Sequence, residues 1–543
     1  MQDDRVAQLN KELESAITNL SDYHRDMLMH GDYYRYSAFF GRQAGQAADY
    51  KRLPDNFLKV FADKNIHYSS EMPEFKVMGS PEDRDNANIR EKVLYGVHRK
   101  SGTRLLQKLW ARDKTIRSMA IAETTFDLQN RCVRVKRYDP RRVYWKTSNA
   151  NEQRVNVFWA VYPITATEAQ QRYGVTPEKD YLSMSITEQV DPYIGKMDGQ
   201  TWFTMAIRWD SKTRVAWIGD KMIEEQHEHF MGEIPIDIDV PFPSDRVDRF
   251  GEFYLEPLVP LQAELNSNIL ERSKIVKRMS NPIFWASNMK SKTYDEVKAA
   301  LKNGDSGMIG LAKDGQVGLL QLQELQMLDN HIDGLIAHMQ RLSGFAAASF
   351  GESVGANTSG DALGMYFTPT QKHDDDQNIN QIMFYESINA KILKLYDVFG
   401  RTGETFSLDG YSPRSTITAS DEQGDYSMNS GGGYNIQFDR TAISGNYVSR
   451  AIPPSVIPRN DLAEKQFWVK AAQDKIISRT TAYEKIGLES PEDEKDLLEI
   501  EQADPLLNPQ GTQQMMQGAL AAGQLTNPQP ALPAATPQTP NGV

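Results

Sequence analysis

The first pattern with catalytic potential is a literal Gly-x-Ser-x-Gly, which reads GESVG from Gly351 to Gly355 and has Ser353 at its centre. In α/β-hydrolases this pattern forms a nucleophile elbow, which needs a strand directly before the serine and a helix directly after it. Here a long helical pattern precedes the serine and more loop follows it. A soluble, hydrolase-like enzyme that uses Ser353 or acidic clusters is therefore the alternative, and not the favoured, interpretation.

Two histidine-containing segments could bind a metal ion. His227 and His229 in EEQHEHF would share one face of a strand, but no third ligand of clear spacing lies near them. In HDDDQ, the run Asp374, Asp375 and Asp376 follows His373, and consecutive residues of a helix point in different directions. We expect an acidic surface or channel-facing patch there, and we predict no metal site and no cofactor.

Composition excludes several classes of protein. The chain has 543 residues, a formal net charge of −12 and a pI near 5.4, which disfavours tight wrapping of nucleic acid. The single cysteine, Cys132, permits no intrachain disulfide and no cysteine-based zinc site, in keeping with a reducing compartment. The charged N-terminal segment does not resemble a signal peptide, and no window approaches the roughly 18 apolar residues that a membrane-spanning helix needs.

The N-terminal half of the sequence predicts helices followed by strands. Apolar spacing predicts an amphipathic helix over residues 3–30 and a mostly helical stretch over residues 86–125. Alternating residues then predict a strand, a turn at Asp139 and Pro140, and a second strand within 132–145. Hairpins are expected over residues 201–226, and residues 233–245 suit an edge strand because prolines interrupt them.

Long helices dominate from residue 256 onward. One is expected over residues 256–279, and a small mixed α/β insert separates it from a second helix whose apolar residues recur at steps of three and four: Leu325, Leu328, Ile332, Leu335, Met339 and Leu342. We interpret this seam as a helix–helix contact. A third helix, over about 359–400, contains Pro369, where we expect a kink.

Shorter elements complete the chain. Residues 403–450 have β and turn character, and three short helices are predicted within residues 461–503. Residues 504–543 are rich in Pro, Gln and Ala and are expected to be a disordered tail. The fold class predicted from these elements is α+β.

A segment of mostly small residues, the small-residue segment, joins the second and third long helices. It is rich in small residues, and its only charge before Asp361 is that of Glu352. Glycine restricts the backbone little, so such a segment can change conformation readily. The segment comprises Phe350, Gly351, Glu352, Ser353, Val354, Gly355, Ala356, Asn357, Thr358, Ser359 and Gly360.

The order of these elements resembles the portal proteins of tailed bacteriophages over roughly residues 1–500. Gly251, Gln262 and Asn266 occupy the positions at which this family begins its first stem helix. The other local similarities are YDPRRVYW at 138–145, NTSGDALGMYF at 357–367 and ISRTTAYEKIGLESPEDEKDLLEIE at 477–501.

The resemblance implies a portal architecture with an α/β wing, a two-helix stem, a small α/β clip, a kinked tunnel helix and a helical crown. The implied parts are the N-terminal wing at 1–255, stem helices at 256–279 and 324–346, the clip at 280–323, the tunnel loop at 347–360, the tunnel helix and C-terminal wing at 361–460, the crown at 461–503 and the tail at 504–543.

The family's function is that of a conduit and not of an enzyme. The resemblance implies a homo-oligomeric ring of twelve subunits at one capsid vertex, through which double-stranded DNA passes without sequence specificity. It also implies docking of the large terminase subunit and a head–tail adaptor, contact with the major capsid protein and with a scaffold protein, no membrane partner, assembly in the host cytoplasm and a final location in the virion. On this interpretation the small-residue segment approaches the DNA most closely, and Asp374, Asp375 and Asp376 face the channel.

Overall fold

The computed structural model describes most of the chain up to residue 453 and one short stretch beyond it. The described residues are 2–35, 55–77, 79, 81–147, 155–180, 202–229, 231–246, 249–280, 284–289, 311–319, 325–351, 360–401, 403–411, 416–421, 424–429, 433–453 and 467–472. The chain divides into two compact units, Met1–Ile457 and Pro458–Val543. The described elements combine helices and sheets, which confirms the mixed α and β class.

The N-terminal helix is shorter than predicted and is followed by a second one. In place of a single helix over 3–30, the structure has α1 (Gln2–Asn19) and α2 (Ser21–Arg35). The Ser21 hydroxyl donates a hydrogen bond of 2.9 Å to the carbonyl of Thr18, which satisfies an acceptor at the end of α1. A third helix, α3 (Phe57–Tyr68), follows.

The mostly helical stretch predicted over residues 86–125 is present as two helices, but its last residues are not helical. Helix α4 (Arg84–Ser101) ends at Gly102, whose φ of 67° is left-handed, and α5 (Thr103–Arg117) then ends at Ser118. The next residues form strand β2 (Ala120–Asp127). Its first five residues are all buried, so the strand lacks the alternation of polar and apolar residues that would have identified it.

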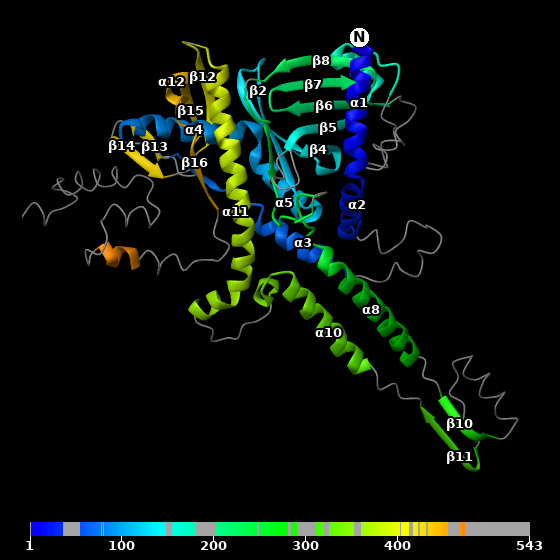
Figure 1. Ribbon diagram of the computed structural model, residues 1–543. Helices are drawn as coiled ribbons and strands as arrows, with labels where there is room; N and C mark the ends of the chain where they lie inside the picture. The colour runs from blue at the N-terminus through cyan, green and yellow to red at the C-terminus, as the bar shows by residue number, and fades with distance from the viewer. Residues whose placement is uncertain are drawn as a thin grey trace, which may run out of the picture. The chain divides into compact units, whose positions relative to one another are not determined.

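Two antiparallel sheets form the β-rich part of the chain (Figure 1). The first has the order β3–β2–β9, with β3 (Cys132–Tyr138) and β9 (Ile236–Asp239) on its edges, so the predicted edge strand is confirmed. The second is a five-stranded meander made of β4 (Val143–Thr147), β5 (Val155–Thr165), β6 (Trp202–Asp210), β7 (Thr213–Ile218) and β8 (Lys221–Glu228). Helix α6 (Ala166–Tyr173) follows β5.

The remaining strands form two-stranded pairs. Strand β1 (Glu74–Val77) pairs with β16 (Ser449–Ile452), although the two are far apart in the sequence. The other pairs are β10 (Phe284–Met289) with β11 (Leu311–Leu319), β12 (Thr405–Tyr411) with β15 (Gly433–Asp439), and β13 (Thr416–Asp421) with β14 (Gly424–Asn429), and the short helix α12 (Arg440–Ile443) lies between β15 and β16.

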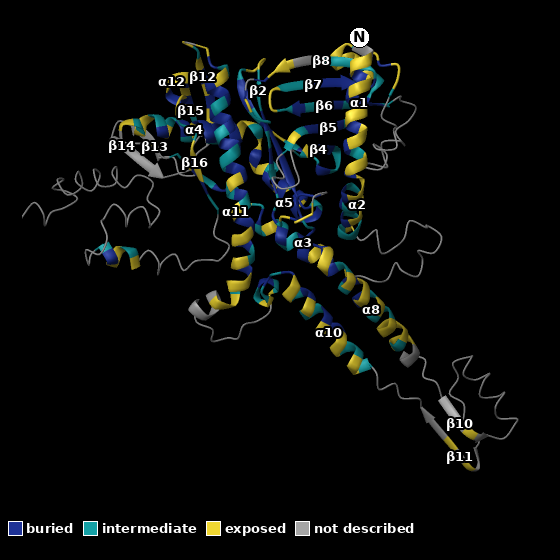
Figure 2. Ribbon diagram, in the orientation of Figure 1, coloured by how far each residue is buried: buried dark blue, intermediate teal, exposed yellow. Residues whose placement is uncertain are grey.

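Two hydrophobic cores support these sheets. In the first, α1 and α2 lie against the five-stranded sheet, and Trp145, Trp159 and Trp217 are among its buried side chains. In the second, α4 and the C-terminal half of α11 (Gly360–Phe399) pack against β2, β3, β12 and β15. Figure 2 shows the consequence for α11, which is mostly exposed in its N-terminal part and buried in its C-terminal part.

The three long helices appear close to their predicted bounds. They are α8 (Val259–Ser280), preceded by the 3-10 turn η6 (Glu256–Leu258), then α10 (Leu325–Leu342), and the 40-residue α11. Pro369 lies inside α11 near its N-terminal end, and the helix changes direction in this part of its length (Figure 1). The predicted insert between α8 and α10 contains the β10–β11 hairpin, and residues 290–310 lie outside the described residues.

The second unit is described only at residues 467–472, which are helical and lie within residues 461–503, where three short helices are predicted. The other predictions beyond residue 472 fall outside the described residues. Among the helices that the structure describes, none combines the length and apolar character needed to cross a bilayer.

Candidate functional site

The small-residue segment starts and ends within the described part of the chain, but its middle lies outside it. Phe350 closes the short 3-10 turn η7 (Ala347–Phe350), Gly351 follows with a left-handed φ of 85°, and Gly360 begins α11. Residues 352–359 are outside the described residues. The roles predicted for Ser353 and its neighbours therefore stay predictions, and the site is built here from the two ends of the segment.

Two aromatic side chains fix the start of the segment to α3. Phe345 is 3% exposed, and its ring stacks on that of Tyr68 with 5.4 Å between the centroids. The ring of Phe350 meets the ring of Phe61 edge-on, also at 5.4 Å. Aromatic pairs at such distances add about 0.5–1.5 kcal/mol to the energy of area burial, so the segment leaves α10 from a firmly held base.

The backbone just before the segment passes directly over the ring of His373 in α11. A Cβ on Gly344 would lie only 2.7 Å from Nδ1 of His373, and the φ of Gly344 is +80°. Only glycine meets both conditions without strain. Nearby, the Tyr254 hydroxyl donates a 3.0 Å hydrogen bond to the carbonyl of Ser343, which holds the end of α10 in place.

Thr370 of α11 supplies the polar contact for the same segment. Its Oγ1 accepts a hydrogen bond of 2.8 Å from the backbone N–H of Ala346 and lies 3.1 Å from Oγ of Ser349. Thr370 is fully buried, at 0% exposure. The residues just before the small-residue segment are thus bound to the first turns of the helix that follows it.

A buried polar network connects this part of α11 to α3 and α5. The Gln377 side-chain amide donates to Oδ1 of Asn65 at 2.9 Å and lies 2.9 Å from Nε2 of His373, and Asn65 in turn donates to Oγ1 of Thr115. Burial lowers the pKa of His373 to about 4, against the opposing effect of Asp376. The imidazole is therefore neutral at pH 7, and the network is uncharged.

The three predicted acidic residues do not share one environment. Asp374 is 5% exposed and accepts a hydrogen bond of 2.6 Å from Nδ2 of Asn378. Burial raises the pKa of its carboxyl group to about 6, although the hydrogen bond from Asn378 and the charge of Lys114 lower it. Asp375 and Asp376 are exposed. The carboxyl group of Asp374 thus lies inside the chain, and only its two neighbours offer charge to a surface.

The apolar seam of α10 packs against α8. Four residues of the seam share a hydrophobic cluster with Leu265 of α8: Leu328, Ile332, Leu335 and Met339. Leu325 is partly buried, and Leu342 is 46% exposed and lies outside the cluster. Helix–helix packing is therefore present at four of the six positions.

Polar contacts accompany the packing of α8 on α10. Arg272 of α8 donates a 2.5 Å hydrogen bond to Asp329 of α10, and Nε2 of His331 lies 3.1 Å from a carboxylate oxygen of Glu264. All four side chains are largely exposed to water, which screens the charges, so these contacts add little to stability. The apolar seam, and not these pairs, supplies most of the contact energy.

Gln262 has a role that the sequence did not reveal. It is fully buried in α8, and its Oε1 accepts hydrogen bonds from the backbone N–H groups of Phe57 (3.0 Å) and Leu58 (3.3 Å) at the start of α3. Its Nε2 donates to the carbonyl of Asp55 at 3.1 Å and to Oδ1 of Asn266 at 2.8 Å. The side chain of one helix thus caps another that is about two hundred residues away in the sequence.

Two buried ion pairs join the helices to strand β9. Lys114 of α5 lies 3.1 Å from a carboxylate oxygen of Asp239 and donates to Gln381 of α11 at 3.0 Å, and Lys391 of α11 lies 2.6 Å from Asp237. The partners are far apart in the sequence, which carries no local signal for such pairs. Removal of one partner would leave a buried charge, which costs about 3–5 kcal/mol.

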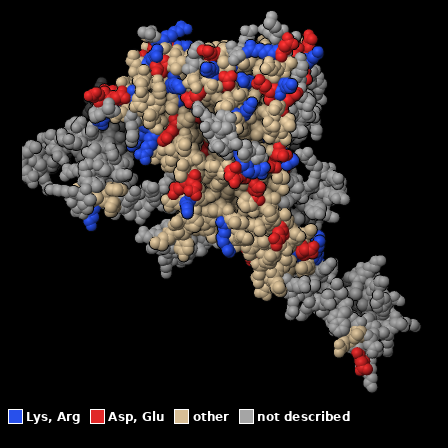
Figure 3. Space-filling view, viewed as in Figure 1, with Lys and Arg blue, Asp and Glu red and all other residues tan. Residues whose placement is uncertain are grey.

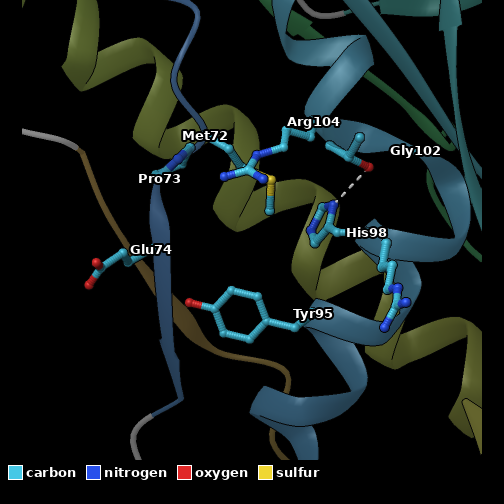
Figure 4. A pocket seen from close by; sticks show the side chains of 9 residues that line it. Met72, Pro73, Glu74, Tyr95, His98, Gly102 and Arg104 are labelled. Carbon is cyan, nitrogen blue, oxygen red and sulfur yellow. Dashed lines mark hydrogen bonds between the residues drawn. The ribbon is translucent and has the colours of Figure 1, made fainter. Parts of the chain in front are cut away.

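A pocket of about 520 Å³ lies beside α4 and α5, and His98 and Thr103 are among the residues that line it (Figure 4). Nδ1 of His98 lies 3.1 Å from Oγ1 of Thr103, and Nε2 lies 2.8 Å from Oδ1 of Asn389, so both ring nitrogens are engaged. Burial lowers the pKa of His98 to about 4. Thr103 is 0% exposed, so its hydroxyl is not accessible to a substrate, and this group of side chains is structural.

The histidine pair considered as a metal site has structural contacts instead. His229 is 7% exposed, and its Nε2 lies 2.9 Å from the carbonyl oxygen of Asp210. In the part of the chain that the structure describes, no group of three or more His, Cys, Asp or Glu side chains is arranged to hold a metal ion. Neither His227 nor the HDDDQ run is brought together with further ligands there.

Comparison with known protein families gives a match over the middle of the chain. Residues 110–391 match the family model described as "Phage portal protein, SPP1 Gp6-like". The match covers just over half of the chain and includes α8, α10 and most of α11. No curated protein sequence shows a significant match to the chain.

Proposed function

The chain belongs to the SPP1 Gp6-like family of phage portal proteins, and from this premise we propose that it forms a twelve-subunit ring at one capsid vertex through which DNA is packaged and ejected. Portal proteins are structural and non-enzymatic, are components of the virion capsid and act as oligomers with phage assembly partners. In this proposal the ring also serves as the platform for the large terminase subunit and the head–tail adaptor.

Exposed acidic side chains on α11 support a channel that lets DNA slide. Asp375 and Asp376 are exposed, whereas Lys372 is the one exposed cation in the same two turns of the helix. A duplex can slide past a surface that repels it but stops at one that binds its phosphates. At 0.1 M salt the repulsion is screened over about 10 Å, which still matters in a channel little wider than DNA.

Exposed apolar side chains on α11 support assembly into an oligomer. Met365, Tyr366, Ile379 and Met383 are between 53% and 75% exposed in the isolated chain. Large apolar side chains that gather on one element are typical of surfaces that another protein covers. In a ring, the neighbouring subunit would bury them.

The proposed parts of the portal correspond to elements of the fold. We assign α8 and α10 to the stem, the insert with β10 and β11 to the clip that meets motor and adaptor, residues 347–360 to the tunnel loop and α11 to the tunnel helix. The sheets and α1–α5 would form the wing, and residues 461–503 the crown. The major capsid protein and a scaffold protein are the proposed partners of the outer surface.

Native mass spectrometry of the full-length protein tests the ring. We expect a species near twelve times the chain mass of 61.5 kDa, and a monomer would overturn the proposal. A cryo-EM map of the ring then tests the channel, because residues 350–360 should lie nearest the symmetry axis. A map that places them at the periphery would contradict the tunnel-loop assignment.

The acidic channel has its own test. In the double variant D375N/D376N we expect short linear duplexes to bind more tightly at low salt than they bind to wild type, because the repulsion is removed. Asp374 is left unchanged because it is buried. The matched control is E264Q/E271Q, which removes two exposed carboxylates of α8. Equal effects of the two variants would mean that only net charge matters.

A further inference from the structure

The sequence between Glu91 and Asp113 contains only positive charges. In this stretch of an acidic chain there is no Asp or Glu, and its cations are Lys92, Arg99, Lys100, Arg104, Lys108 and Arg112. It covers the end of α4 and most of α5. Every one of these six side chains is exposed.

Four of these cations are defined here as the basic stripe: Lys100, Arg104, Lys108 and Arg112. The last three recur every four residues along α5, so they lie on one side of the helix, about 6 Å apart along its axis. Lys100 lies in the last turn of α4, just before the break at Gly102.

The stripe is not neutralised by the fold. In the described part of the chain, no carboxylate forms an ion pair with Lys100, Arg104 or Lys108, while buried neighbours such as Lys114 and Arg117 are paired. Arg112 packs over the ring of Tyr34 at 5.3 Å.

Some other exposed cations on helices of the protein are paired with carboxylates. Arg25 pairs with Asp22, Arg172 with Glu168 and Lys274 with Glu271, each with a carboxylate one helical turn away. The face shown in Figure 3 accordingly mixes the two signs of charge. Lys100, Arg104 and Lys108 differ from these paired cations.

The stripe and the acidic residues of α11 lie on different faces. Gln107 and Lys114 of α5 point toward α11, since Gln107 accepts from the Tyr385 hydroxyl at 2.7 Å and Lys114 donates to Gln381. At 100° per residue, Arg104 and Lys108 project from another side of α5. Whatever binds the stripe need not contact the surface with Asp375 and Asp376.

We propose that the basic stripe is a second DNA-binding surface, which contacts the phosphate backbone of duplex DNA that lies outside the channel. The inference rests on the proposed function, because DNA as a partner comes from it. Phosphates recur on each strand every ~3.4 Å along the DNA axis, so cations about 6 Å apart on a helix that lies obliquely can meet successive phosphates. A row of cations without interspersed acids is the expected electrostatic footprint of such a surface.

The test uses full-length protein and relaxed circular duplex DNA, which cannot thread through a closed ring. Binding is measured over a salt series for wild type and for K100Q/R104Q/K108Q. Each cation that no longer neutralises a phosphate reduces the slope of log K against log salt by roughly 0.9, so we expect the slope to be less steep by roughly 2.7. The conservative variant K100R/R104K/K108R should bind like wild type.

The matched control is R25Q/R172Q/K274Q, which changes net charge by the same amount at exposed cations that are paired in the fold. We expect its slope to equal that of wild type. The proposal is overturned if wild type does not bind circular DNA, if the stripe variant keeps the wild-type slope, or if the slope of the control falls as much as that of the stripe variant. Tighter binding of poly-glutamate than of duplex would assign the stripe to an acidic protein and also overturn it.

Failure of the proposed function gives a different result. If the protein forms no ring, linear and circular duplexes should bind equally, and the stripe variant still tests the basic surface. If the ring forms but the stripe variant binds circular DNA with the wild-type salt slope, the proposal of a second DNA-binding surface is wrong. The proposed portal function is then unaffected.

Discussion

Replacement of Asp374 by Asn should stabilise the protein, and the gain should depend on pH. The folded structure raises the pKa of this buried carboxyl group from 3.8 to about 6. Below about pH 3.8 the group is protonated in both the folded and the unfolded state, and it carries no penalty. Between the two pKa values the unfolded chain releases its proton first, so stability falls as pH rises. Above about pH 6 the carboxyl group is charged in both states, and its burial lowers the free energy of unfolding by the full amount, about 3 kcal/mol.

Asparagine removes the charge and keeps the shape of the side chain. Its carbonyl oxygen can still accept the hydrogen bond from Asn378, so the packing around position 374 is preserved. The free energy of unfolding of D374N should therefore exceed that of wild type by less than about 1 kcal/mol near pH 4, by about 1–2 kcal/mol near pH 5 and by about 3 kcal/mol near pH 8. Urea denaturation of the full-length protein at each pH measures the difference.

The control is D375N, one residue along the same helix. Asp375 is exposed, so its replacement should change stability by no more than about 0.5 kcal/mol at any of these pH values. A gain for D374N that is the same at pH 4 and pH 8 would refute the argument from burial. A loss at pH 8 would mean that attraction to Lys114 outweighs desolvation, the opposite of the balance inferred here.

Two further variants test how the helices are held together. L335D places a charge in the seam between α8 and α10, so it should destabilise the protein by several kcal/mol and lower its thermal midpoint. The control M327D changes the 76% exposed Met327 of the same helix and should have little effect. Equal midpoints of the two variants would contradict packing through the seam. G344A should destabilise the protein by more than about 1 kcal/mol, because Gly344 has a left-handed φ and lies close to His373. G334A, in α10, should stabilise the protein by about 0.5–1 kcal/mol, because the space around its Cβ position is open. Chemical denaturation distinguishes these opposite signs.

The sequence alone determined the long helices and their faces. Apolar residues at steps of three and four predicted a helix over 324–346, and α10 covers Leu325–Leu342. The prediction works because a helix repeats its contacts every 3.6 residues, and this period can be read from the sequence. The hairpin between β6 and β7 was equally visible, since Asp210 and Thr213 mark a turn in which the carboxylate accepts from the Thr213 N–H. The order of such elements was enough to indicate the portal family.

Buried strands and breaks between helices were harder to predict from the sequence. The sequence predicts helix where strand β2 lies, because the strand is covered on both faces and burial erased the alternation on which strand prediction depends. Gly102 is compatible with a helical pattern, yet its left-handed conformation separates α4 from α5.

Only the tertiary structure decided what each polar residue does. Asp374, Asp375 and Asp376 are identical and consecutive in the sequence, but the packing of α11 buries the first and exposes the other two. Gln262 and Phe57, or Lys114 and Asp239, meet only because the chain folds back over long distances. The physical reason is that periodicity records the free energy of burying apolar surface along one element, whereas a hydrogen bond or a pKa depends on which other element supplies the neighbouring atoms.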